Sequence, residues 1–386
     1  MLTRTVPDAP ATRRSPRKER RLWHDETRNP SCLGCSGCPE LRVCGGLRLK
    51  LRSFDCLDFC CGNPSACDRV CRNNPDYVER VREVGGFDLA KVPRARPLVA
   101  PELPPIVPVL FHGSARVARI APPAAALSLY QMFSRRTGEP RHASHEALCA
   151  AFCVMPGTPL VLTGTDRDRP LERWWGFGGE RRRAIIRAAK SAGVVMATTP
   201  NFSLFLDRPR WDDLHAMIRI ALVHWEFMEE GLPAALHING RTEADFARWA
   251  SFLASRPEIT HVAYEFGTGT GWAGRREQHS TWLVGLALSV GRPLALVVRG
   301  GTDMLPSLAS AYASVTVLET NVFMKTVMRQ RAVSAGAGAP LVWQASPTPP
   351  GAPIDGLWAD NWAAVETWHA SAGPAPRRKL AGVRAA

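Results

Sequence analysis

From residue 106 onward, short apolar runs rich in β-branched residues alternate with longer stretches of helical periodicity. The apolar runs predict strands at 107–112, 159–163, 194–198, 234–239, 261–266, 294–299, 315–319 and 341–344. The stretches between them predict helices near 124–134, 143–154, 179–192, 210–230, 242–255, 275–290, 303–313 and 322–332. Strands that are apolar almost throughout, each followed by a helix, indicate a parallel sheet buried on both faces.

Eight strand–helix units in this order favour an α/β fold of the (β/α)8 TIM-like barrel type, which needs roughly 250 residues. A distorted or seven-stranded barrel is one alternative, because the first unit is long and the last strand is weak. A doubly wound open sheet is the other. The chain has no P-loop and no G-x-G-x-x-G after a strand, and the Gly-rich run 267–272 lacks the Lys and the spacing of either motif.

The composition shifts along the chain predict six regions. They are a disordered basic tail (1–22), a cysteine-rich module (23–74), a helix with a Pro-rich linker (75–105), the barrel (106–346), a C-terminal helix (347–372) and a second basic tail (373–386). Within the linker region, residues 76–84 read as a short helix that ends at Gly85-Gly86. Trp358, Trp362 and Trp368 lie on the C-terminal helix, which we expect to pack on the barrel.

The cysteine-rich module holds nine of the eleven cysteines within forty residues. They are Cys32, Cys35, Cys38, Cys44, Cys56, Cys60, Cys61, Cys67 and Cys71. Close-set thiolates with Gly and Pro between them suit soft-metal ligation, so all nine are candidate metal ligands. A disulfide-stapled knot and scattered reduced thiols are the alternatives.

The spacing within the module is closer to that of an iron–sulfur site than to that of a zinc finger. The first three cysteines form C-x2-C-x2-C with a fourth, Cys44, further on, and a second group begins at Cys56. The match to the ferredoxin run is partial, since Pro39 follows the third cysteine rather than the last. An iron–sulfur cluster is therefore the predicted cofactor, with zinc as the alternative.

The charge of the chain is concentrated at its ends. The formal net charge is +14, and residues 1–22 carry seven Lys or Arg against two Asp or Glu, a net +5. Basic tails can hold phosphate backbones, so DNA or RNA is a candidate partner, although such tails can also serve solubility alone. No apolar run is long enough to span a bilayer and the N-terminus lacks a secretory h-region, so we expect a cytoplasmic protein without membrane contact.

Polar residues close several predicted strands, where barrels and doubly wound sheets place their sites. The full set is His112, Thr163, Asp166, Thr199, Asn201, His237, Asn239, Glu265, Arg299, Glu319, Asn321 and Lys325. Glu265 and Glu319 could act as acid and base or hold a cation, and Arg299 could bind a phosphate or carboxylate. Asn201, Asn239 and Lys325 complete the candidate catalytic set. A structural ion pair, such as Arg299 with Glu265, is the alternative.

The stretch 199–209, TPNFSLFLDRP, places N-F-S-L-F at a strand end, followed by an acidic residue, a Pro and a long helix. In this it resembles a domain-of-unknown-function family of bacterial, archaeal and phage proteins with a P-D-F-S-type motif. Asn201 stands where that family has its acidic residue, and the resemblance covers residues 160–300. It implies no known reaction, and its occurrence in mobile genetic elements favours nucleic acid.

Three hypotheses about function follow from these features. The first is a metal- or iron–sulfur-binding barrel protein that binds or processes nucleic acid. The second is a small-molecule barrel enzyme with Glu265, Arg299 and Glu319 in its site and a structural metal module. The third is a non-catalytic interaction protein, for which the absence of a deep polar pocket at the strand ends would speak.

Overall fold

The computed structural model describes residues 48–49, 52–53, 77–204, 210–267, 274–336, 339–349 and 351–371. The chain divides into two compact units. One comprises Met1–Val92, Ser203–Arg219 and Gly240–Arg248, and the other comprises Pro93–Phe202, Ile220–Asn239 and Trp249–Ala386. The second unit contains every strand of the central sheet.

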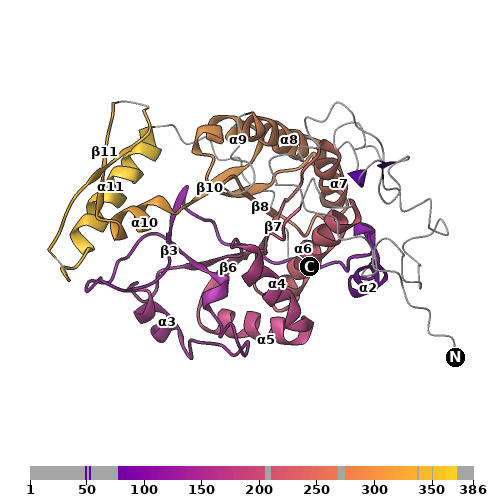
Figure 1. Cartoon of the computed structure of the whole chain (residues 1–386), viewed down its shortest axis with the longest axis horizontal. Coiled ribbons are helices and arrows are strands. Elements are labelled where there is room, and N and C mark those ends of the chain that lie inside the picture. The colour runs from indigo at the N-terminus through magenta and orange to yellow at the C-terminus, as the bar shows by residue number, and fades with distance from the viewer. Residues whose placement is uncertain are drawn as a thin grey trace. The chain divides into compact units, whose positions relative to one another are not determined.

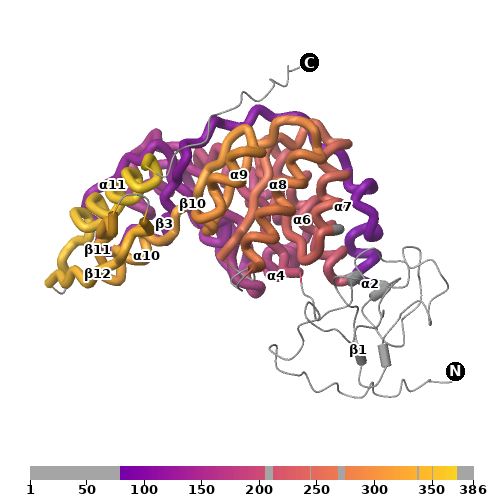
Figure 2. The backbone as a smooth tube through the Cα atoms, turned by 90° about the horizontal axis from the view of Figure 1, so that it is seen from above, coloured from indigo at the N-terminus to yellow at the C-terminus, as the bar shows by residue number. Residues whose placement is uncertain are grey.

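The central sheet is a closed barrel of eight parallel strands (Figures 1 and 2). In chain order these are β3 (Ile106–Leu110), β4 (Ala125–Ser128), β5 (Leu160–Thr163), β6 (Val194–Thr198), β7 (Ala234–His237), β8 (His261–Glu265), β9 (Ala295–Arg299) and β10 (Ser314–Glu319). Each strand pairs with the next in sequence, and β10 pairs back with β3 to close the ring. The predicted TIM-like barrel is therefore confirmed.

Small and branched side chains fill the inside of the barrel. They are Val107, Val109, Ala124, Ala126, Val161, Met196, Ala235, Ala263, Val297 and Leu318. Successive side chains on a strand point to opposite faces, so every second residue from these positions also faces the interior. The same alternation places each polar strand end on the interior or on the outer face of the barrel.

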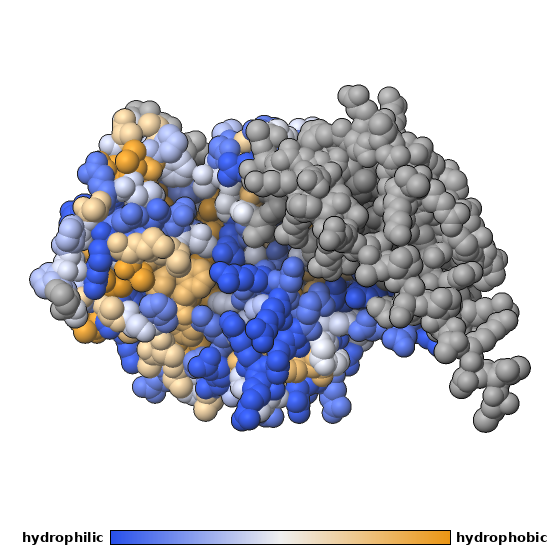
Figure 3. All heavy atoms as spheres, in the orientation of Figure 1, coloured by the Kyte–Doolittle hydropathy of each residue, from blue (hydrophilic) through white to orange (hydrophobic). Residues whose placement is uncertain are grey.

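Helices alternate with the strands around the barrel. They are α3 (His145–Ala151), α4 (Asp168–Gly176), α5 (Gly178–Ser191), α6 (Arg210–Glu229), α7 (Glu243–Ala254), α8 (Arg275–Val290), α9 (Leu305–Ala311) and α10 (Asn321–Val327). Local signals set their ends: the Ser144 hydroxyl accepts a hydrogen bond from Ala147 N–H at the start of α3, and Gly291 ends α8 with a φ of 69°. Hydrophilic residues gather over α4 and α5 (Figure 3), where Arg181, Arg187 and Lys190 are exposed.

The second barrel strand was not predicted from the sequence. Residues 124–134 were expected to form a helix, but they form β4 and the 3-10 helix η6 (Leu129–Gln131). The Ala and Leu residues here favour a helix in isolation. In the barrel every residue of β4 is buried between β3 and β5, and small side chains fit that position, so tertiary packing overrides local propensity.

The predicted eighth strand at 341–344 is not part of the barrel. It forms β12 (Val342–Ala345), which pairs antiparallel with β11 (Gln330–Val333) in a separate hairpin. The helix predicted near 322–332 is correspondingly shorter, because β11 begins at Gln330. Since β4 supplies the missing strand, β10 is the eighth strand of the barrel rather than the seventh.

The C-terminal helix α11 (Asp355–Ser371) packs on α10 and on this hairpin (Figure 2). Its Asn361 side chain accepts a hydrogen bond from Ala332 N–H at 2.7 Å and donates one to Gln330 O at 2.8 Å. Trp358 and Trp362 stack with ring centroids 5.8 Å apart. The helix was expected to lie on the barrel itself, and this hairpin contact is a feature that the sequence did not indicate.

The other unit contributes the helix α2 (Tyr77–Glu83), which matches the short helix predicted at 76–84, together with the short strands β1 (Arg48–Leu49) and β2 (Arg52–Ser53). Glu83 accepts a hydrogen bond from the His215 ring at 2.8 Å, and Arg80 forms an ion pair with Asp212 at 3.3 Å. Among the described residues, no helix is long and apolar enough to cross a membrane.

All nine cysteines between 32 and 71 lie outside the described residues, as do both basic tails. The iron–sulfur or zinc site and its ligands therefore stay predictions. Within the described ranges, no group of three or more His, Cys, Asp or Glu residues could hold a metal ion. The two remaining cysteines, Cys149 and Cys153, are free thiols.

Candidate active site at the carboxyl end of the barrel

Glu265 and Arg299 lie side by side at the carboxyl ends of β8 and β9. They are register partners in the sheet, two residues beyond Ala263 and Val297, which belong to the barrel core. Both residues therefore face the interior at the mouth of the barrel. Arg299 Nε lies 3.5 Å from Glu265 Oε2, and the Gly267 N–H donates to Oε1 at 2.6 Å.

Burial dominates the electrostatics of this pair. The Glu265 side chain is only 4% exposed, and desolvation raises its pKa above the ordinary value, against the opposing effects of Arg299 and of the Gly267 hydrogen bond. The Nε contact lacks hydrogen-bond geometry, so Oε2 accepts no hydrogen bond from the described residues. The Arg299 side chain is 25% exposed, and its Nη1 donates to Thr165 O at 3.4 Å.

Close backbone contacts hold the neighbouring strand ends in place. Gly164 N–H donates to the Thr198 hydroxyl at 2.9 Å, and the Tyr130 hydroxyl donates to Gly164 O at 2.8 Å. A Cβ atom on Gly164 would lie 2.5 Å from the backbone carbon of Thr199, so only glycine fits between β5 and β6. The ends of these strands are thereby fixed, which positions the Thr165 carbonyl that Arg299 contacts.

His237 is the last residue of β7 and shares the interior face with Ala235. It is 3% exposed, and neither ring nitrogen has a hydrogen-bond partner among the described residues. Burial lowers its pKa to about 3, so the imidazole is neutral at neutral pH. Its backbone N–H donates to the Thr199 hydroxyl at 2.8 Å, and its ring stacks on Tyr264. A buried imidazole with both nitrogens unpaired is uncommon in protein interiors and often marks a functional position.

Asn239 and Asn201, both predicted site residues, lie in the loops that follow β7 and β6. The Asn239 side-chain amide donates to Phe202 O at 2.7 Å, and the backbone carbonyl of Asn239 accepts from the Trp249 indole N–H at 2.9 Å, so Asn239 ties this loop to α7. Asn201 is 7% exposed, and its Oδ1 has no partner in the described part of the chain. Asn201 thus retains an unused polar atom, whereas the side-chain N–H and the backbone carbonyl of Asn239 are both engaged in hydrogen bonds.

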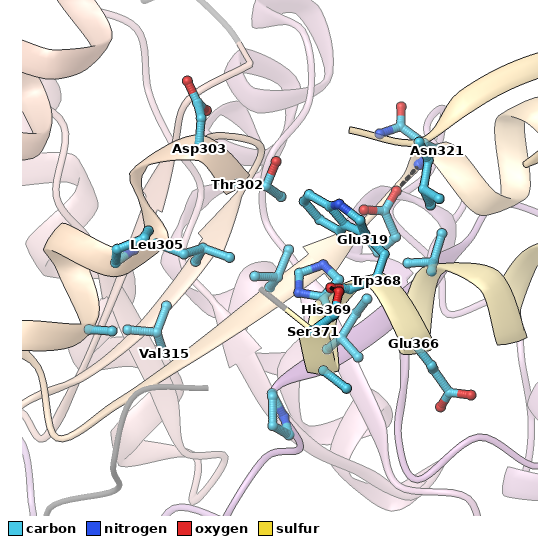
Figure 4. Close-up of a pocket in the computed structure, with 18 of the residues that line it drawn as sticks. Thr302, Asp303, Leu305, Val315, Glu319, Asn321, Glu366, Trp368, His369 and Ser371 are labelled. Atoms are coloured by element: carbon cyan, nitrogen blue, oxygen red, sulfur yellow. Dashed lines mark hydrogen bonds between the residues drawn. The ribbon is translucent and has the colours of Figure 1, made fainter. Parts of the chain in front are cut away.

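Glu319 and Lys325 do not join this group. Glu319 is in register with Pro108 and shares a face with Val317, while the alternate residue Leu318 belongs to the barrel core. Glu319, predicted to act together with Glu265, therefore does not share its face, because its side chain lies on the outer side of β10. It accepts a hydrogen bond from Asn321 N–H at 2.5 Å (Figure 4). Lys325 is half-buried on α10.

The structure contains a large pocket that the sequence did not predict. Its volume is about 1150 Å³, and Glu319 is one of the residues that line it (Figure 4). Its walls combine the outer face of β10 with α9, the hairpin and α11, which are far apart in sequence. The cluster of tryptophans after residue 340 was the one sequence signal that could have indicated it, through Trp343 and Trp368.

No family model matches the chain, and no curated protein matches it. The resemblance of residues 160–300 to the P-D-F-S family therefore stays a prediction.

Among solved structures, the chain is similar to a putative dihydrodipicolinate synthase family protein from Coccidioides immitis, with 16% identity, 61% of this chain and 71% of that chain covered, and a TM-score of 0.34. It is also similar to a dihydrodipicolinate synthase from Agrobacterium tumefaciens, with 11% identity, coverage of 60% and 72%, and a TM-score of 0.31. A putative lyase/mutase from Burkholderia cenocepacia has 18% identity, coverage of 65% and 85%, and a TM-score of 0.33. Likeness at this level carries no argument about activity, and none of these similarities supports nucleic-acid binding.

Proposed function

We propose that the chain is a small-molecule enzyme that binds an anionic substrate at the mouth of the barrel and moves a proton through Glu265. The observation that carries this proposal is the buried Glu265 carboxyl beside the partly exposed Arg299 guanidinium, on the interior face at the carboxyl ends of two adjacent strands. In barrels of this kind, residues at the carboxyl ends of the strands are the ones that carry chemistry.

Arg299 supplies the binding contact. Its guanidinium donates to the Thr165 carbonyl and the side chain is one quarter exposed, so it can pair with a carboxylate or phosphate of the substrate. An anion that pairs with Arg299 weakens the attraction that keeps the Glu265 pKa down. Substrate binding therefore raises the pKa of Glu265 further and makes the carboxylate a stronger base.

His237 supplies a neutral hydrogen-bonding group on the same interior face. An unpaired imidazole gains a hydrogen-bond partner when a substrate oxygen or nitrogen reaches it. This favours a substrate with a polar group at that position over one with an apolar group. Thus Arg299 would fix the charge of the substrate, His237 would orient its polar end and Glu265 would exchange the proton.

The test uses two variants and a panel of 2-oxo acids, 2-hydroxy acids and sugar phosphates, with turnover followed by NMR and binding by calorimetry. Arg299→Ala should abolish binding of the anions that the unaltered protein binds. Glu265→Gln should keep that binding and lower turnover by about 10²–10⁴-fold, the usual contribution of a positioned acid or base.

Glu230→Gln serves as the matched control, because Glu230 pairs with Arg187 away from the mouth, and it should leave turnover unchanged. Turnover in Glu265→Gln equal to that of the unaltered protein would remove Glu265 from the mechanism. Anion binding that survives Arg299→Ala would remove Arg299. The nucleic-acid hypothesis rests on tails outside the described residues and stays a prediction.

A further inference from the structure

We infer that the pocket on the outer side of β10 is a second binding site, and that it takes an organic ammonium ion with an apolar, aromatic-sized body. The site is separate from the barrel mouth, because β10 directs Thr316 and Leu318 to the interior and Val315, Val317 and Glu319 to the pocket. The inference therefore stands independently of the proposed enzymatic function.

The pocket lies on the outer face of β10, where no long helix follows the strand in the described part of the chain. After β10 the chain forms only the seven-residue helix α10 and then leaves for the hairpin, and α11 packs on α10 and β11. The floor is consequently made of strand residues, Ile106, Val315 and Val317, of which Val315 is half-buried. The volume of about 1150 Å³ reaches the upper end of the size of small-molecule sites.

The walls are largely apolar, which suits a hydrocarbon or aromatic body. Leu305 and Ala309 of α9 form one side, and Leu341, Trp343 and Val365 form the other. Trp368 also lines the pocket, and its indole nitrogen donates to Ala339 O at 2.8 Å, which leaves the ring face for packing. Indole faces beside a carboxylate are a typical setting for an ammonium group, since the ring face is electronegative.

The charged residues that line the pocket select the sign of the ligand. Asp303, Glu319 and Glu366 carry carboxylates, and no Lys or Arg is found among the described residues of the lining. This is notable in a chain whose net charge is +14. Asp303 pairs with Arg276 at 3.3 Å, whereas Glu319 is 6% exposed and, among the described residues, has only hydrogen-bond donors of the Asn321–Val322 turn as partners. A cation that enters the pocket would supply the counter-ion that Glu319 lacks.

His369 adds a hydrogen-bonding group at the same place (Figure 4). Its Nε2 is shielded from solvent without a partner in the described part of the chain, and burial lowers its pKa to about 4. The ring is therefore neutral at neutral pH and adds no positive charge that would repel a cation.

The test measures binding of 4-phenylbutylammonium and of 4-phenylbutyrate to the full-length protein by calorimetry at neutral pH. These probes share one body and differ in the sign of the charged group. The ammonium should bind, and the carboxylate should bind at least about tenfold more weakly. Glu319→Gln should weaken ammonium binding by about tenfold while it keeps an oxygen that can accept the Asn321 N–H. Asp360→Asn, which removes a carboxylate on α11 that pairs with Arg331 outside the pocket lining, should leave binding unchanged.

Val315→Phe gives a second measurement that does not depend on the fold of the Glu319 variant, because it fills the floor of the pocket without touching any charge. It should lower ammonium binding by at least about tenfold. Equal affinity for the two probes, or ammonium binding that neither variant weakens, would overturn the inference. Loss of turnover in Glu265→Gln bears only on the barrel mouth, so failures of the two sites can be told apart.

Discussion

Glu265 and Glu319 occupy equivalent places in the chain and different places in the molecule. Each is the last residue of a barrel strand, each is 6% exposed, and each accepts a hydrogen bond from the backbone N–H two residues later. Burial raises the pKa of both. Yet Glu265 faces the interior beside Arg299, and Glu319 faces an outer pocket that no Lys or Arg among the described residues lines.

This difference shows that strand register, rather than position at a strand end, decides what a carboxyl can do. Val317 pairs with Val298 and Leu318 with Arg299, so a one-residue offset would exchange the two faces of β10. At the mouth the carboxyl has a fixed counter-ion that a substrate anion can divert. In the outer pocket no described Lys or Arg pairs with the carboxyl of Glu319, so a ligand would bring the positive charge.

The two regions also differ in packing, and the largest expected effect tests that difference. Gly164→Ala should lower the free energy of unfolding by about 3 kcal/mol, because its Cβ would lie 2.5 Å from the Thr199 backbone at the mouth. Val315→Phe, which adds far more volume in the outer pocket, should change it by less than about 1 kcal/mol. Both are measured by urea denaturation.

Gly176→Ala is the control for the glycine change, because nothing lies within 4 Å of the added Cβ and its backbone needs no left-handed conformation. It should be neutral or stabilising by a few tenths of a kcal/mol up to about 1. A Gly164→Ala protein as stable as the unaltered one would mean that β5 and β6 can separate at the mouth.

Removal of the counter-ion should have the next largest effect. Arg299→Met should lower the free energy of unfolding by about 2 kcal/mol at neutral pH, because it leaves the buried Glu265 charge uncompensated. This value already allows for the solvent screening that follows from the partial exposure of Arg299. The substitution should also raise the pKa of Glu265 further, while that of Glu319 stays where it is. Carboxyl NMR titration follows both groups, and thermal or urea unfolding gives the stability.

The sign of the pH dependence follows from the raised pKa of Glu265. The folded state holds this proton more tightly than the unfolded state, so the stability from this group is present at low pH and is lost as pH rises through the folded pKa. Arg299→Met should therefore be least destabilising in acid. In a Glu265→Gln background the same substitution should cost little at any pH, and a full cost there would show that Arg299 stabilises the fold through other contacts.

The smallest expected effect concerns the imidazole side chains of His237 and His369. The His237 pKa of about 3 lies below the unfolded value, so its contribution to stability is present above the unfolded pKa and is lost as pH falls towards the folded one. His237→Gln should reduce the loss of stability between about pH 7.5 and about pH 5.5 by about 1 kcal/mol. His369→Gln should have a smaller effect, since that residue is only partly buried. Identical pH profiles for His237→Gln and the unaltered protein would show that a hydrogen-bond acceptor or solvent stabilises the protonated His237 ring in the folded state.

Much of the barrel could be predicted from the sequence, because buried parallel strands read as apolar runs whatever surrounds them. The exception is instructive: 125–128 is Ala-Ala-Leu-Ser, which has no β-branched residue and becomes a strand only because β3 and β5 bury it from both edges. The run 341–344 has the opposite character. Leu341, Val342 and Trp343 read as a core strand, yet Val342 is 48% exposed in the hairpin.

The candidate site could be predicted in part for a similar reason. The ends of the predicted strands mark His237, Glu265 and Arg299 as candidates, and the structure places all three on the interior face. The end of a strand alone does not show which residue faces the interior, and so Glu319 was grouped with Glu265 although Leu318 is the residue of β10 in the barrel core. No local pattern shows that the helix expected after β10 is cut short and followed by a hairpin, and therefore none predicts the pocket.

The closure of the barrel by β10 and β3 has a consequence for how the chain folds. Val317 and Ile106 pair across about 210 residues of chain, so the sheet is an open one with two unpaired edges until the last strand arrives. During synthesis β3 and β9 would remain unpaired edge strands, and incomplete chains would be prone to associate with one another. Slow ring closure, rather than weak local structure, should therefore set the folding rate of this barrel.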